Sequence, residues 1–67
     1  MRPCYKKLFK MLIDRDISRK QIKVDLKLSG NTFTKLVNSK YVSMEILARI
    51  CEYLNADIGD IMSFEKE

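Results

Sequence analysis

The chain has 67 residues, of which 46% are hydrophobic and 33% are charged, a balance typical of one small folded domain and too apolar for a disordered chain. No apolar run approaches the roughly 20 residues that cross a bilayer, and the charged N-terminus is unlike a signal peptide, so we expect a cytoplasmic protein with no membrane partner. The formal net charge is +4, and two cysteines without any histidine exclude a four-ligand zinc site.

The first helix is predicted over residues 5–15. Apolar residues recur there at helical spacing with lysines on the opposite side, and the apolar side consists of Tyr5, Leu8 and Leu12, with Phe9 and Ile13 at its edges. Residues 14–16 break the pattern and are predicted to form a loop.

A second, shorter helix is predicted after this loop. Ser18 stands at its start as a cap, and Gln21 three residues later predicts a capping box. The helix is expected to end near Lys27, after about two turns. Ser29 is the next cap, and it predicts a third helix over residues 30–38.

The third helix is expected to close at a left-handed residue, either Asn38 or Ser39. Ser43 then caps a fourth helix, whose first turn carries an acid where the helix dipole favours one. A wide apolar stripe continues to Asn55, which is predicted to end this helix.

The last helix is predicted to be short. Asp57 caps it, and it contains Ile58, Ile61 and Met62. The tail 64–67 is expected to fray. No segment alternates with a period of two residues, so the sequence predicts an all-α fold with five helices.

The second and third helices with their tight turn, over residues 18–38, have the sequence form of a helix-turn-helix. The apolar positions that would lock the pair are Ile22, Leu26, Leu28, Phe33 and Leu36. The string ISRKQIKVDLKLSGNTFTKLVNSKYVSMEILARICEYLNADIGDIM resembles the lambda-repressor/Cro-like (XRE-type) helix-turn-helix domains of bacterial and phage regulators. The resemblance implies a compact five-helix bundle, with residues 1–67 as one domain around the helix-turn-helix.

The resemblance also implies a function: sequence-specific binding of double-stranded DNA by a transcriptional regulator, with the helix 30–38 in the major groove. A homodimer is expected because a domain this small covers few base pairs, and no cofactor or small-molecule ligand is expected. The residues expected to face base edges are Gly30, Asn31, Thr34 and Lys35. The residues expected to contact phosphates are Arg19, Lys20, Ser29 and Lys40.

The residue types suit these roles. The amide of Asn31 matches the N6/N7 edge of adenine, and Lys35 one turn later can donate to guanine or to a phosphate. Thr34 can contact a thymine methyl, and Gly30 permits close approach to the groove. The alternative is that the polar residues only satisfy the first amides of the helix while Lys35 is solvated.

Two positions depart from the family pattern. Lys27 stands where the inter-helix turn usually carries glycine, and a left-handed lysine there costs roughly 1 kcal/mol. Lys23 stands where a small residue usually lets the two helices approach. In the first helix, Lys6, Lys7 and Lys10 either join the phosphate contacts or form a solvated face.

Charge is divided unevenly along the sequence. Residues 1–40 carry eleven Lys and Arg against three acids, whereas residues 41–67 carry two against six. The basic part suits a polyanion such as DNA. The acidic part suggests an alternative function, a helical module that binds a protein partner. It also holds the residues considered for a dimer surface, Tyr53, Ile58, Met62 and Phe64.

An enzyme is not expected. The sequence has no histidine, no glycine-rich phosphate loop and no paired-carboxylate cleft that 67 residues could desolvate. Cys51 is expected to be a small buried apolar residue, and a disulfide with Cys4 is not expected in a cytoplasmic protein.

Overall fold

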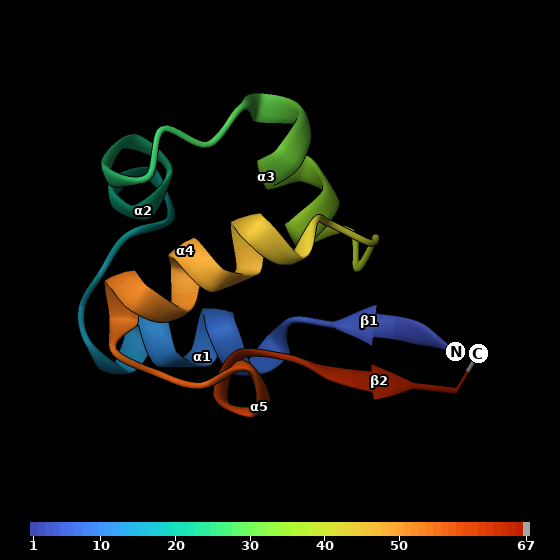
Figure 1. Cartoon of the computed structure of the whole chain (residues 1–67). Helices are drawn as coiled ribbons and strands as arrows, with labels where there is room; N and C mark the ends of the chain where they lie inside the picture. Colours follow the sequence, from blue (N-terminus) through green and yellow to red (C-terminus); the bar gives the residue numbers. More distant parts are fainter. Residues whose placement is uncertain (67) are drawn as a thin grey trace.

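The computed structural model describes residues 1–66, which form five helices and two short strands (Figure 1). In chain order these are β1 (Arg2–Cys4), α1 (Lys6–Asp14), α2 (Arg19–Asp25), α3 (Gly30–Val37), α4 (Met44–Leu54), α5 (Ile58–Ile61) and β2 (Ser63–Glu65). The prediction of a compact five-helix fold is confirmed, and the boundaries differ by one or two residues. Asp14, predicted in a loop, is the last residue of α1.

Three serines begin three of the helices, as predicted. The hydroxyls of Ser18, Ser29 and Ser43 each accept a hydrogen bond from the backbone N–H three residues later, at 3.0 to 3.3 Å. The capping box predicted at α2 is only half present, because the Gln21 amide donates to the Asp25 carboxylate instead of reaching back to Ser18.

Four of the helices end with a left-handed residue that is not glycine. These residues are Asp16, Lys27, Ser39 and Asn55, with φ between 52° and 58°. The residue that follows each of them in the sequence donates its N–H to the carbonyl five residues before it. One example is the bond from the Leu28 N–H to the Lys23 carbonyl at 2.9 Å. This is the Schellman arrangement, which satisfies the last carbonyls of a helix. Ser39 and Asn55 confirm the predicted ends of α3 and α4.

All five helices contribute to the core, and α2 and α3 lie above α1, α4 and α5 in Figure 1. The buried apolar residues of the core include Leu8, Leu12, Ile22, Leu28, Leu36, Ile50, Leu54 and Ile61. Leu28, in the turn between α2 and α3, is buried as its spacing suggested. Ile13, at the edge of the predicted apolar side of α1, is 77% exposed.

The expectation that the tail 64–67 frays is wrong for Phe64 and Glu65. These residues lie in β2, which pairs antiparallel with β1 so that Phe64 is opposite Pro3. Glu67 lies outside the described residues. The strands are three residues long and come from opposite ends of the chain, so neither shows an alternating pattern that a local reading can detect. Met62, expected in the last helix, is already extended and leads into β2.

None of the helices in residues 1–66 is long and apolar enough to cross a membrane. Both cysteines are free thiols: Cys4 is buried in β1, and Cys51 is half-buried on α4.

Candidate nucleic-acid interface

The outer face of α3 carries the four residues predicted to face bases. Gly30, Asn31, Thr34 and Lys35 are all exposed. On the opposite face Leu36 is buried, which anchors α3 to the core and leaves its polar side turned to solvent.

The contacts around Thr34 and Gly30 indicate what each of these residues can offer to a ligand. The Thr34 hydroxyl donates to the Gly30 carbonyl at 2.8 Å, so its hydrogen is used inside the helix and its methyl group remains for an outside contact. A Cβ added at Gly30 would meet no atom within 4 Å. Packing within the protein therefore does not require a glycine at this position.

Ser29 acts as the cap of α3. Its hydroxyl accepts from the Thr32 N–H at 3.1 Å and lies 3.0 Å from the Thr32 hydroxyl. Since the hydroxyl is engaged, an anion at this end is best met by the first backbone N–H groups of the helix, which have no intrahelical acceptor. Thr32 takes part in the cap and is not among the residues predicted to face bases.

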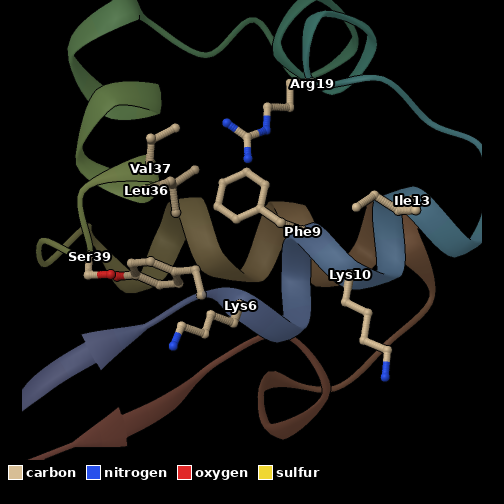
Figure 2. A pocket seen from close by; sticks show the side chains of 9 residues that line it. Lys6, Phe9, Lys10, Ile13, Arg19, Leu36, Val37 and Ser39 are labelled. Carbon is tan, nitrogen blue, oxygen red and sulfur yellow. The ribbon is translucent and has the colours of Figure 1, made fainter.

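Arg19 and Lys20 are exposed at the start of α2, where phosphate contacts are predicted. The Arg19 guanidinium lies over the ring of Phe9 on α1, 4.5 Å from the ring centre (Figure 2). Phe9 also meets Phe33 of α3 edge-on, with the ring centres 6.4 Å apart. Phe9 thus connects the start of α2 to α3.

Lys23, which departs from the family pattern, is accommodated on the surface. Its ammonium group lies 5.9 Å from the centre of the Phe33 ring, so the side chain covers an aromatic face. The turn at Lys27 adopts the left-handed conformation considered for it, with φ 52°. The Arg49 guanidinium of α4 donates to the carbonyl of Leu26 beside this turn.

Lys40 is exposed in the loop after α3, where a phosphate contact is predicted. Its backbone carbonyl accepts a hydrogen bond from the hydroxyl of Tyr5 at 2.9 Å. Tyr5 is 2% exposed, and this burial raises the pKa of its phenol. The loop is therefore attached to the start of α1.

The structure thus places all eight predicted contact residues at the surface, on α3, at the start of α2 and in the loop after α3. Sequence reasoning missed the residues that hold these elements, namely Phe9, Tyr5 and Arg49. Phe9 and Tyr5 were detected only as apolar positions of α1, and no sequence feature of α1 indicates which later residue they meet.

The residues considered for a dimer surface divide into two groups. Tyr53, Ile58 and Met62 are half-buried and pack against the core, whereas Phe64 is 55% exposed on β2. The Tyr53 hydroxyl also donates to Asp25. Hydrogen bonds from Gln21 and then from Tyr53 lower the pKa of the Asp25 carboxyl.

Among residues 1–66, no group of three or more His, Cys, Asp or Glu side chains could hold a metal ion. The paired acids Asp57 and Asp60 form the capping box of α5, in which each carboxylate accepts a backbone N–H.

Known proteins match both the sequence and the fold of this chain. A family model described as the Cro/C1-type HTH DNA-binding domain matches residues 7–67. The chain is similar to the crystal structure of the transcriptional regulator VanUg, with a TM-score of 0.96 and 44% sequence identity, over 98% of this chain and 88% of that one. No curated protein matches the sequence significantly.

Proposed function

The chain belongs to the family of Cro/C1-type helix-turn-helix DNA-binding domains, which are not enzymes, and on that premise we propose that it regulates transcription by binding a specific DNA sequence with α3 in the major groove. The observation that carries this proposal is the polar outer face of α3, flanked by cations at the start of α2 and in the loop after α3.

In this proposal α3 distinguishes the bases. Asn31 donates to N7 or accepts from N6 of an adenine, and Lys35, one turn further on, donates to a guanine. Because its hydrogen is bonded to Gly30, Thr34 offers its methyl group to a thymine. Gly30 lies where the edge of the groove comes closest to the backbone of α3.

The phosphate contacts fix the position of α3. Arg19 and Lys20 bind the DNA backbone on one side, and Lys40 binds it on the other. At Ser29 the contact comes from the first amides of α3, because the serine hydroxyl already caps the helix.

We propose further that two copies bind a two-fold related site. A domain of this size covers few base pairs, and two half-sites about 34 Å apart supply the missing specificity. Phe64 is the residue considered for a dimer surface that remains more than half exposed.

Selection of bound sequences from a random DNA pool tests binding, base preference and site symmetry together. Engagement of five or six cations in each bound copy contributes about −5 to the slope of log affinity against log salt, at about 0.9 for each phosphate contact. Asn31→Ala should relax the preference at one base pair by about 1–3 kcal/mol.

Lys35→Glu and Lys40→Glu should abolish binding, and Lys66→Glu, which makes the same charge reversal after β2, is the matched control. Absent or salt-independent binding by the folded protein would contradict the proposal. That result would favour the alternative, a helical module that binds a protein through its acidic half.

A further inference from the structure

A hollow of about 420 Å³ lies between α1, the start of α2 and the end of α3 (Figure 2). Figure 2 shows Phe9 near its centre, Arg19 reaching down from α2, and Leu36 and Val37 on the side of α3. The residues that line it are Tyr5, Lys6, Phe9, Lys10, Ile13, Arg19, Leu36, Val37 and Ser39.

The charged groups of this hollow are all positive. Lys6 and Lys10 project from α1 along its lower edge in Figure 2, and Arg19 closes its upper side. None of the nine lining residues is acidic. Such a surface is complementary to an anion that also has an apolar part.

The apolar floor of the hollow is partly open to solvent. Ile13 is 77% exposed and Val37 is 42% exposed, and the ring of Phe9 lies between them. Two exposed apolar residues beside a half-buried aromatic ring around one hollow favour a contact surface.

The hollow is continuous with the proposed DNA contacts at both ends. Arg19 stands at one end, and Ser39, next to Lys40, stands at the other. Ser39 also borders a second hollow of about 240 Å³, whose lining includes Lys40 and Arg2 of β1. The backbone strand that contacts Arg19 therefore lies next to the first hollow.

We propose that this hollow binds a segment of the DNA sugar-phosphate backbone, with Lys6 and Lys10 of α1 as phosphate-contacting residues and Phe9 as the positioning residue of Arg19. The proposal rests on the proposed function and adds α1 to its DNA-binding elements. Phosphates bind the cations at the rim, and deoxyribose carbons lie over the apolar floor.

The geometry of α1 fits a strand of DNA. Lys6 and Lys10 are four residues apart, so they lie on one side of the helix with their Cβ atoms about 5–6 Å apart. Nucleotides of one strand follow one another at about 3.4 Å along the axis, and flexible lysine side chains easily reach phosphates at that separation.

Phe9 acts on DNA binding indirectly, by orienting the side chain of Arg19. The guanidinium of Arg19 lies over the aromatic ring, and this contact limits the orientations of its donors before DNA arrives. Less conformational freedom is then lost on binding. Phe9 itself is held by its edge-on contact with Phe33, so Arg19 is fixed relative to α3.

The lysines are tested by measuring DNA affinity across a salt series for Lys6→Ala, Lys10→Ala and the double variant. For each bound copy, a single variant should reduce the slope of log affinity against log salt by about 0.9, and the double variant by about twice that. Lys7→Ala is the matched control on the same helix, because its ammonium is turned towards α5 and donates to the Gly59 carbonyl at 3.1 Å.

A double variant that binds DNA with the wild-type slope would overturn the contribution of α1. Equal losses in Lys7→Ala and Lys6→Ala would also overturn it, since the effect would then follow net charge and not the hollow. Failure of the wild-type protein to bind any DNA is a different result, because it contradicts the proposed function itself.

Phe9 is tested by a double-mutant cycle with Arg19→Ala. Phe9→Leu keeps an apolar side chain but removes the ring, and it should weaken DNA binding about two- to fivefold. The loss should disappear in the Arg19→Ala background, and Phe9→Tyr should restore wild-type affinity. An equal loss with and without Arg19 would overturn the positioning role, as would a failure of Phe9→Tyr to restore affinity in a variant that melts like the wild type.

Discussion

The hydroxyl of Tyr5 donates a hydrogen bond to the backbone carbonyl of Lys40, with 2.9 Å between the two oxygen atoms. The bond joins the residue before α1 to the loop after α3, two places that are far apart in sequence. One of the proposed phosphate contacts therefore depends on a buried residue outside the helix-turn-helix.

Tyr5→Phe should lower the free energy of unfolding by about 1 kcal/mol, because it removes the hydrogen bond to Lys40 and keeps the apolar ring. Urea denaturation measures this change. Tyr41→Phe is the matched control, since the Tyr41 hydroxyl bonds to the Met1 carbonyl on the surface and its loss should have a smaller effect. Equal effects of the two variants would contradict the importance of the buried bond.

Stability should fall at high pH in a way that depends on Tyr5. Burial raises the pKa of the Tyr5 phenol in the folded protein above its ordinary value of 10.0. As pH rises, the unfolded chain therefore loses this proton first. The stability that Tyr5 contributes is complete below pH 10 and is lost as pH rises through the pKa of Tyr5 in the folded protein. Denaturation curves from pH 8 upward should show a steeper decline for the wild type than for Tyr5→Phe. The pKa of Tyr53, raised by its bond to Asp25, affects both proteins alike.

Lys27→Gly should stabilise the protein by up to about 1 kcal/mol. Lys27 has φ 52°, a conformation that costs a residue with a side chain about 1–2 kcal/mol and costs glycine little. Part of the gain is offset by the greater freedom of glycine in the unfolded chain. Lys66→Gly, outside the elements, controls for the loss of charge, and thermal denaturation compares the two. A melting temperature that falls in Lys27→Gly would show that the turn does not carry this strain.

Gly30→Ala should separate stability from DNA binding. The added methyl group meets no atom of the protein within 4 Å, and alanine favours a helix over glycine by up to about 1 kcal/mol, so the melting temperature should rise. DNA affinity should fall, because in the proposed complex the groove comes close to Gly30. A binding assay in which Gly30→Ala matches the wild type would place Gly30 away from the DNA.

Glu65→Gln should raise DNA affinity about two- to fivefold at low salt. The Glu65 carboxylate lies 3.7 Å from the Arg2 guanidinium and 3.9 Å from the Lys6 ammonium, so it competes with phosphates for both cations. Exposed pairs of this kind contribute at most about 1 kcal/mol, and stability should change little. Glu52→Gln is the matched control, because it removes one negative charge from α4, away from Arg2 and Lys6. Equal gains in both variants would show a general charge effect.

The helices and their caps could be predicted because their determinants are local. Ser29 and Thr32 are three residues apart, and Asn55 ends an apolar stripe that the sequence shows directly. The candidate contact residues could be predicted in the same way, because the apolar residues of α3 recur at helical spacing and define one buried side. The exposure of Asn31 and Lys35 follows from the burial of Leu36.

What could not be predicted joins residues that are distant in the sequence. The contact of Arg19 with Phe9 depends on the angle between α1 and α2, which the sequence of the loop between them does not reveal. The pairing of β1 with β2 was missed because three residues are too few for an alternating pattern. Gln21 was misassigned for another reason: its amide had two possible partners, and the Asp25 carboxylate, a charged acceptor, forms the stronger bond.

The pairing of β1 with β2 also bears on folding kinetics. Cys4 and Ser63 are adjacent in the sheet but lie at opposite ends of the described chain, so closing this contact costs more chain entropy than any helix or cap. Such a contact is expected to form after the transition state, when the five helices have already packed. Substitutions in β2 should therefore speed unfolding and leave the folding rate almost unchanged. The sheet would then act chiefly on the lifetime of the folded domain.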